Sequence, residues 1–417
     1  MNARARWLSA LLVSLATACA SQPPSSLPGS STDDGPTTRL WRRGAEARDF
    51  ERFTRDGTVL AADGALVLSE TARASTVPFP TGAPPDAGTS ATLDAYRLGT
   101  AVSELQAVSG GFDSVVPSFE AQTPPGTWVQ VWVAARIEGR WTRDYELGVW
   151  ASERDTVSRH SVNAQEDADG AVATDTLNLK RRADALRVTV GLYATRPDAS
   201  PRVRALTAAV TDTRRTAEDS AAERTAWGTA LEVPGYSQML YPDGGEVWCS
   251  PTSTTMLLGY WSRKLGRATL EEPVPQAAAH TYDVAYQGTG NWSFNTAYAS
   301  ARGSGELQGL VARLDTFAQV ERLIAAGLPV SISIAFEEGE LTGAPSRRTD
   351  GHLIVVRGFT PEGDVLCNDP AARSNEGTAV TYRRSELWRA WRHSRGAAYV
   401  LWPTGTALPP DVVEWLR

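Results

Sequence analysis

Cys249 is the residue whose type and setting are best suited to nucleophilic chemistry. It lies in the segment 248–253 (WCSPTS), directly before residues 254–265, whose apolar side chains recur at helical spacing. Pro251 suits the first turn of such a helix, because its missing N–H would have no partner there. The N–H groups and positive end of a helix N-terminus stabilise an anion, and so favour the nucleophilic thiolate. We therefore predict that Cys249 is a nucleophile.

A thiol nucleophile needs a proton acceptor, and the sequence contains four histidines. His352 opens the apolar segment 352–359, an expected strand, and the preceding glycine leaves space beside its ring. His160 in a strand-rich region and His280 in a polar loop are expected on the solvated surface, and His393 is expected as a surface or capping residue after a helix. We predict that His352 is the general base. The alternative is a structural histidine at a strand end.

Asp369 is the acid best placed to orient the imidazole of His352. It follows a predicted strand, residues 364–368, which the short turn 360–363 joins to the strand of His352. Two antiparallel strands joined by so short a turn bring their open ends side by side. An acid there would hold the histidine tautomer and stabilise the imidazolium. Asn368 is the substitute candidate, and a turn carboxylate before proline is the alternative role of Asp369.

Gln238 precedes Cys249 in the chain, within the segment 233–238 (VPGYSQ). The tetrahedral intermediate of acyl transfer carries an oxyanion that requires preorganised hydrogen-bond donors. We predict that the side-chain amide of Gln238 and the backbone N–H of Cys249 form this oxyanion hole.

The length of the chain and the periodicity of its apolar residues predict two domains. A chain of 417 residues suits two hydrophobic cores better than one. In residues 39–212 apolar side chains alternate with period two, as at 128–133, and helical periodicity is scarce, which predicts an antiparallel β-sandwich. From residue 231 onward helical and strand patterns mix, with Asp315 as an expected helix cap, which predicts an α+β domain. The charged, alanine-rich residues 213–230 are the predicted linker, part of which could be helical.

The first residues predict export. Two arginines precede an apolar run at 7–16 and small residues, as in a secretory signal peptide. Cys19 follows directly, and residues 15–19 resemble a lipoprotein cleavage site, so lipidation of Cys19 and plain secretion both remain open. Apart from Cys19 only Cys249 and Cys367 remain, and in an oxidising compartment a structural disulfide between them is the alternative to a catalytic thiol.

Charge and composition narrow the function classes. The net charge of −7 and the pI near 5.4 provide no basic field for a phosphate backbone, so no nucleic-acid partner is expected. Cysteines and histidines are too few and too scattered for a zinc site, and there is no phosphate-binding glycine loop, so neither a metal nor another cofactor is expected.

Four segments in order, 233–238, 248–256, 351–358 and 368–370, resemble cysteine peptidase family thirty-nine. This is the papain-like family of bacteriocin-processing, double-glycine leader peptidases and their stand-alone relatives. The resemblance covers roughly residues 231–402 and implies a papain-like fold. It assigns the nucleophile, the base, the orienting acid and the oxyanion donor, in this order, to Cys249, His352, Asp369 and Gln238. Two features depart from the family: Ser250 stands where glycine is frequent, and no transporter or nucleotide-binding region accompanies the peptidase region.

The sequence therefore predicts an exported cysteine peptidase that hydrolyses an amide bond through a thioester intermediate. Its expected partners are a peptide or protein substrate, including cell-wall peptides, and the membrane only through an N-terminal lipid anchor. The alternatives are an amidase or acyl-transferase acting on cell-wall peptides, and a surface binding protein with a vestigial site that uses Trp128, Trp132, Trp141 and Trp150. The predicted boundaries are a signal peptide at 1–19, a flexible tether at 20–38, a β-sandwich at 39–212, a linker at 213–230, a papain-like peptidase domain at 231–405 and a tail at 406–417.

Overall fold

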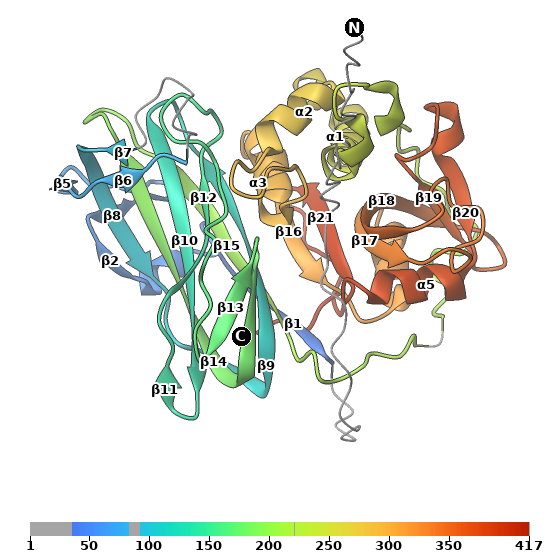
Figure 1. Ribbon diagram of the computed structural model, residues 1–417, viewed down its shortest axis with the longest axis horizontal. Coiled ribbons are helices and arrows are strands. Elements are labelled where there is room, and N and C mark those ends of the chain that lie inside the picture. Colours follow the sequence, from blue (N-terminus) through green and yellow to red (C-terminus); the bar gives the residue numbers. More distant parts are fainter. Residues whose placement is uncertain (1–35, 83–91, 221, 417) are drawn as a thin grey trace, which may run out of the picture.

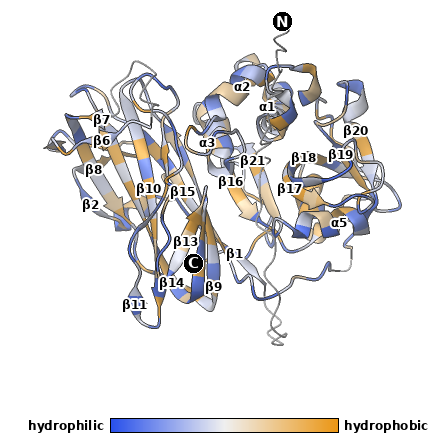
Figure 2. Ribbon diagram, in the orientation of Figure 1, coloured by the Kyte–Doolittle hydropathy of each residue, from blue (hydrophilic) through white to orange (hydrophobic). Residues whose placement is uncertain are grey.

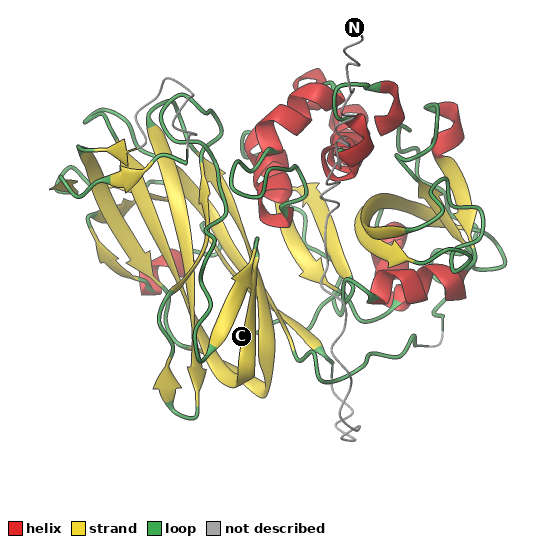
Figure 3. Ribbon diagram, viewed as in Figure 1, coloured by secondary structure: helices red, strands yellow, loops and turns green. Residues whose placement is uncertain are grey.

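The computed structural model describes residues 36–82, 92–220 and 222–416. Antiparallel strands dominate the N-terminal part, whereas helices and strands mix in the C-terminal part, which lies beside it (Figures 1 and 3). This agrees with the two types of domain that the sequence predicts. The predicted signal peptide, Cys19 and most of the predicted tether lie outside the described residues.

Thirteen strands of the N-terminal part form one hydrogen-bonded network. Its central strands are long: β9 (Gln106–Gln122), β10 (Thr127–Ile137), β14 (Thr176–Ala194) and β15 (Arg202–Thr211). Strand β14 pairs with β9 along its first half and with β10 along its second half, so it links two groups of strands. The other strands are β1 (Thr38–Gly44), β2 (Thr54–Asp56), β3 (Thr58–Leu60), β4 (Leu66–Leu68), β5 (Arg73–Ser75), β8 (Tyr96–Val102), β11 (Arg140–Trp141), β12 (Tyr145–Trp150) and β13 (Gly170–Ala173), and the pair β6 (Phe79–Pro80) and β7 (Thr92–Leu93) stands apart.

The alternation in β10 produces the expected inward face, but its other face is covered too. Val129, Val131 and Val133 are buried in the main core, as their spacing predicts. Trp128, on the opposite face, is also buried, and it stacks on Tyr193 with ring centroids 5.1 Å apart in a second cluster of aromatic side chains. Strand β10 is therefore buried on both faces, although alternation of this kind is typical of a half-buried strand. Because Trp128 packs in a core, its indole face is not available to a ligand.

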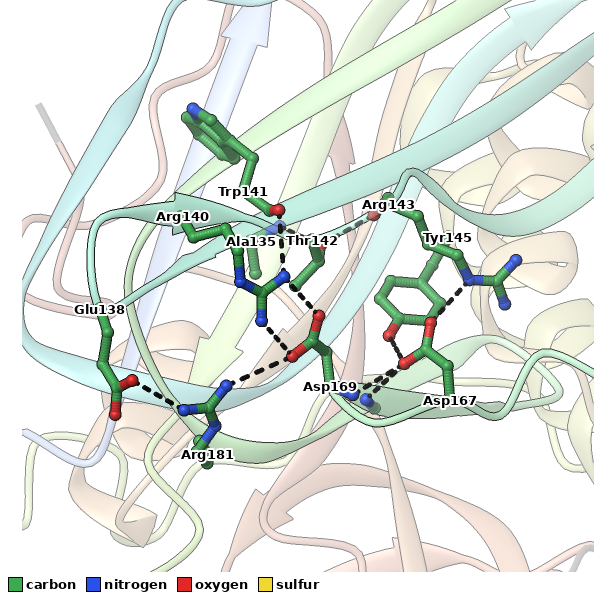
Figure 4. Close-up of polar contacts among 11 residues, drawn as sticks. Ala135, Glu138, Arg140, Trp141, Thr142, Arg143, Tyr145, Asp167, Asp169 and Arg181 are labelled. Carbon is green, nitrogen blue, oxygen red and sulfur yellow. Dashed lines mark hydrogen bonds and ion pairs between the residues drawn. The ribbon is translucent and has the colours of Figure 1, made fainter.

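A network of charged side chains holds the tip of the β10–β11 hairpin against the turn before β13 (Figure 4). The guanidinium of Arg140 donates two hydrogen bonds to Asp169, at 2.8 and 2.7 Å, and Arg181 bridges Asp169 and Glu138. The hydrogen bond from Arg140 is the main cause that lowers the pKa of Asp169 below its ordinary value. Two parallel hydrogen bonds fix orientation better than one, so this exposed hairpin keeps a defined position.

Six antiparallel strands form the sheet of the C-terminal part, in the order β16-β21-β17-β18-β19-β20. Helices α1 to α3 lie together beyond one side of this sheet, and α5 lies on the other (Figure 1). Apolar residues concentrate on the strands, whereas α5 contains many hydrophilic residues (Figure 2). The strands are β16 (Leu307–Arg313), β17 (Val330–Phe336), β18 (Thr349–Phe359), β19 (Val365–Asn368), β20 (Ala379–Tyr382) and β21 (Ala397–Pro403), and the helices are α1 (Cys249–Leu265), α2 (Val274–Thr281), α3 (Trp292–Arg302), α4 (Phe317–Ala325) and α5 (Arg384–Arg392).

Two local expectations need correction. The N-cap of α4 is Thr316 and not Asp315, since Gln319 accepts hydrogen bonds from the backbone N–H groups of both residues in a capping box. The carboxylate of Asp315 instead accepts hydrogen bonds from Thr37 and Thr38 at the start of β1. The described residues of the linker form no helix; they run along the C-terminal part, where Ala230 pairs with Gly358.

Strand β9 docks the N-terminal part onto α3 and β16 of the C-terminal part. The Ser118 hydroxyl accepts a hydrogen bond from the Val311 N–H at 3.0 Å, and the Asp175 carboxylate accepts one from the Trp292 N–H at 2.5 Å, in the first turn of α3. Arg159, fully buried, donates to the carbonyl oxygen of Ala279 at 2.9 Å, and burial lowers its pKa to about 10. The two parts are thus held together by buried polar contacts.

A cavity of about 170 Å³ lies between the two parts and is lined from both of them. Its lining is Trp150, Ser152, Glu153, Glu272, His280, Tyr298, Ala301 and Arg302, and so does not include Gln238, Cys249, His352 or Asp369.

Within residues 36–82, 92–220 and 222–416, no helix is both long and apolar enough to span a membrane. The same residues contain no group of three or more His, Cys, Asp or Glu side chains arranged to hold a metal ion.

Candidate active site

Cys249 is the first residue of α1, at the position that the sequence predicts. The residue is 5% exposed, and the N–H of Thr252 closes the first turn on the carbonyl oxygen of Trp248 at 3.0 Å. No side chain caps this helix N-terminus. The helix therefore directs its positive end toward the region of the Cys249 thiol, which favours the thiolate.

The first turns of α1 lie against the strand that carries His352. The hydroxyl of Ser253 donates to the carbonyl oxygen of Leu353 at 2.9 Å, one residue beyond His352. The hydroxyl of Ser250 hydrogen-bonds that of Tyr399 on β21 at 2.8 Å. Buried hydroxyl groups thus attach this end of the helix to the sheet. These serine hydroxyl groups hold the helix turn of Cys249 against the sheet that contains the strand of His352. The sequence pattern alone did not indicate this role for the two serines.

His352 and Asp369 form a buried hydrogen-bonded pair. The Nε2 atom of His352 lies 2.7 Å from Oδ1 of Asp369, and the two residues are 6% and 1% exposed. In the hairpin of β18 and β19, Val355 pairs with Asn368, so Asp369 follows directly after the paired strand. Because Nε2 faces the carboxylate, Nδ1 is the ring nitrogen left to exchange a proton with a thiol.

Three donors surround the Asp369 carboxylate. Besides His352, the hydroxyl of Tyr382 donates to Oδ2 at 2.6 Å and the N–H of Ala371 donates to Oδ1 at 2.9 Å. Burial alone would raise the pKa of Asp369, but the charge and hydrogen bond of His352, with the bonds from Tyr382 and Ala371, hold it below its ordinary value. Burial and the Asp369 charge raise the pKa of Tyr382, so its hydroxyl keeps its proton and remains a donor.

Asn368, the substitute candidate for orienting the histidine, is engaged elsewhere. Its Oδ1 accepts from Nε of Arg357 at 3.0 Å, and its Nδ2 donates to the carbonyl oxygens of Val233 and Pro234 at 3.0 and 3.2 Å. The residue therefore fastens the chain just before Gln238 to the β18–β19 hairpin, and the partner of His352 is Asp369.

Gln238 is buried and is attached to the Asp369 turn. It begins the 3-10 turn η2 (Gln238–Leu240), and its N–H donates to the carbonyl oxygen of Pro370 at 2.9 Å. Its Oε1 atom has no hydrogen-bond partner among the described residues. Because Oε1 is an acceptor, only the Nε2 end of this buried amide can donate a hydrogen bond to an oxyanion. Its role as oxyanion donor remains a prediction.

The three other histidines differ partly from expectation. His160 is buried, with Nδ1 2.7 Å from the carbonyl oxygen of Ser158, so the expected surface position is wrong; burial lowers its pKa. His280 lies in the last turn of α2 and not in a polar loop, and its ring stacks on Tyr298. His393 is the C-cap of α5, as expected.

Cys249 and Cys367 are not joined in a disulfide. Cys367 lies on β19, opposite Val356, and burial followed by the charge of Asp369 raises its pKa well above the ordinary value. Its thiol is therefore protonated and inert near neutral pH. We expect Cys367→Ala to change peptide hydrolysis by less than about threefold and to cost about 1 kcal/mol of folding free energy, because it leaves a small void.

Steady-state kinetics with and without a reductant, together with thermal unfolding, measure both effects of Cys367→Ala. Activity of the wild type that rises only after reduction, and an alanine variant that lacks this response, would contradict the expectation and indicate a redox-gated thiol pair. If Cys367→Ala fails to fold, the alternative interpretation, a structural disulfide between Cys249 and Cys367, would be favoured again.

Comparisons with known proteins place both parts of the chain in one family. Residues 39–211 match the Peptidase C39 N-terminal domain, and residues 230–399 match the Peptidase_C39 like family. No curated protein matches the chain. A solved structure of the Clostridium thermocellum xylanase 10B CBM22-1–GH10 modules with xylohexaose is 12% identical with a TM-score of 0.17; the alignment covers 42% of this chain and about a third (32%) of that one, and carries no argument about fold or ligand. Since two models of the same peptidase family match successive parts of it, the chain belongs to the C39 cysteine peptidase family.

Proposed function

We propose that this chain is an exported cysteine peptidase that hydrolyses an amide bond of a peptide or protein. The observation that carries the proposal is the buried His352–Asp369 pair, because the strand that carries His352 packs against the helix turn of Cys249. The family match supports a peptidase. We further propose that the C-terminal part has a papain-like fold, and that the N-terminal strand network is a sandwich that positions the substrate or the peptidase.

In the first half of the proposed reaction, the Cys249 thiol transfers its proton to Nδ1 of His352, and the thiolate attacks the substrate carbonyl carbon. The carbonyl oxygen becomes an oxyanion, stabilised by the Cys249 N–H and the amide of Gln238. When the C–N bond breaks, the imidazolium of His352 returns the proton to the leaving amine. A thioester with Cys249 remains.

In the second half, His352 removes a proton from water, which attacks the thioester carbonyl. The C–S bond breaks, the acid product leaves and Cys249 regains its thiol through His352. Asp369 stays ionised throughout, because its pKa is held low, and it stabilises the imidazolium formed in each half-reaction. No step requires a metal or an organic cofactor.

A digest of a peptide library with the purified protein, followed by mass analysis of the products, tests the proposed function. New carboxyl and amino termini are expected at the same bond. The digest is repeated with an added amine, since a new amide in place of the acid would indicate acyl transfer. No cleavage by a protein whose Cys249 reacts with iodoacetamide would contradict the peptidase proposal.

Export is part of the proposal, and Cys19 distinguishes its two forms. If Cys19 is acylated, wild-type protein should sediment with the membrane fraction and Cys19→Ala should move to the soluble fraction, because the acyl chains provide the anchor. Fractionation followed by immunoblotting measures this, with Cys367→Ala as the control for loss of a cysteine elsewhere. Wild-type protein found wholly in the medium would rule out lipidation and leave plain secretion.

A further inference from the structure

An unusual concentration of exposed apolar side chains lies between Gln238 and Cys249. Seven large apolar residues of the described chain are at least 36% exposed, and three of them, Met239 (48%), Leu240 (50%) and Val247 (38%), fall in residues 239–248. We call residues 239–248 the apolar segment. Single exposed apolar residues are ordinary on a protein surface, whereas a cluster of them marks a binding surface.

The backbone of the apolar segment is well ordered by its own hydrogen bonds. The N–H of Tyr241 closes the turn η2 on Gln238, the N–H of Gly245 donates to Tyr241 at 2.9 Å, and the N–H of Trp248 donates to Gly245 at 3.0 Å in the second turn, η3 (Gly245–Val247). The hydroxyl of Thr289 donates to the carbonyl oxygen of Val247 at 3.2 Å. A segment fixed in this way presents its side chains without first paying an ordering entropy.

The two turns of the apolar segment lie against each other. A Cβ atom added to Gly245 would come within 2.0 Å of the carbonyl oxygen of Gln238, so only glycine allows this approach. The rings of Tyr241 and Trp248 have centroids 6.0 Å apart and brace the segment. The exposed side chains are therefore held on a compact unit whose ends are Gln238 and Cys249.

The same segment is acidic. Asp243 and Glu246 are both exposed. Exposed carboxylates beside apolar side chains favour a partner that combines large apolar groups with basic ones. Met239 adds adaptability, because methionine is flexible and suits surfaces that accept more than one apolar shape.

We propose that the apolar segment is the specificity surface of the enzyme, and that it selects peptides with a large apolar side chain close to the scissile bond and a basic residue nearby. The inference rests on the proposed peptidase function, which it deepens by naming the class of substrate. The contact would place the apolar group beside the nucleophile, so that binding energy of the side chain aligns the carbonyl for attack.

The test is the double variant Met239→Ser/Leu240→Ser, with Leu105→Ser as a matched control. Leu105 is 47% exposed but lies in the N-terminal part, between β8 and β9. With a quenched-peptide library, we expect kcat/KM of the double variant to fall about tenfold for peptides with Leu or Phe next to the cleaved bond, and to stay unchanged for peptides with Gly or Ala there. Leu105→Ser should behave as wild type.

A binding measurement keeps the inference separate from the proposed reaction. Fluorescence polarisation with Cys249→Ala protein and a fluorescein-labelled octapeptide of Leu, Phe and two Lys residues should show weaker binding after Met239→Ser/Leu240→Ser, and a matched Gly/Ser octapeptide should bind less well in either background. If the library is not cut but this difference in binding appears, the reaction is wrong and the specificity surface stands. Equal cleavage and equal binding by the double variant would overturn the surface. The rate of Cys249 alkylation by iodoacetamide should be the same in wild type and double variant, and a lowered rate would assign the effect to a damaged site and overturn the proposal.

Discussion

Cys249→Ala is expected to reduce peptide hydrolysis by about 10⁴-fold or more, to near the uncatalysed rate, while the protein remains folded. Every later step in the proposed reaction follows from attack by the Cys249 thiolate, so removal of the sulfur leaves no covalent route. Cys249→Ser should be nearly as inactive, because a hydroxyl without a lowered pKa is a poor nucleophile where a thiolate is used.

The measurement is kcat/KM on a peptide that the wild type cleaves, with Cys367→Ala as the control for loss of a buried thiol. Thermal unfolding should place Cys249→Ala close to the wild type, since a small side chain is removed at a helix start. Alanine variants that turn over at the wild-type rate would show that another nucleophile acts and would refute the mechanism.

Asp369→Asn is expected to lower kcat by about 10² to 10⁴-fold with little change in KM, because the histidine loses the acceptor that fixes its tautomer and stabilises its charged form. The asparagine keeps the shape of the side chain but presents an amide to His352 and Tyr382 in place of a carboxylate. Tyr382→Phe removes one hydrogen-bond donor to Asp369 and leaves the charge of the carboxylate, so we expect it to lower kcat by about tenfold or less. This graded pair separates the charge of Asp369 from its packing.

Asp369→Asn is also expected to change how the stability of the fold depends on pH. The pKa of Asp369 lies below its ordinary value of 3.8, so its contribution to folding is complete above about pH 4 and is lost as the pH falls through the lower, native value. Wild-type protein should therefore lose stability on acidification more steeply than Asp369→Asn. Denaturant unfolding between pH 2 and 7 measures this, and Asp369→Asn with wild-type kcat would remove Asp369 from the catalytic set and leave it a structural acid.

Local patterns in the sequence predicted the parts of the site that depend on neighbouring residues. The helix start at Cys249 follows from residues 248–265, and the juxtaposition of His352 and Asp369 follows from one short hairpin. The partner Tyr382 was missed, because it reaches Asp369 from β20, across a pairing that sequence spacing does not specify. A buried tyrosine ending a strand after the Asp369 turn is the only signal it leaves.

Tertiary packing also decided the expectations that failed. The alternation at 128–133 puts Trp128 on the face of β10 opposite the valines, but it does not reveal that Phe79, Tyr96 and Tyr193 cover that face. Aspartate is a common N-cap residue, so Asp315 was a reasonable candidate. Its carboxylate instead accepts hydrogen bonds from Thr37 and Thr38, which are distant in the sequence. Long-range partners of this kind are set by the assembled fold and not by local propensity.

The contact between Leu40 and the last described residues sets an order of events during biosynthesis. Leu40 in β1 donates to Glu414 at 2.8 Å and accepts from Leu416 at 2.9 Å, while its strand pairs with β15 on the other side. An open strand edge can recruit another chain, and here the covering piece emerges from the ribosome after everything it covers. Until residues 414–416 have been made and have folded back, the edge of β1 at Leu40 remains open to pairing with another chain. The protein is therefore most exposed to misassociation in the interval between synthesis of β1 and synthesis of these residues.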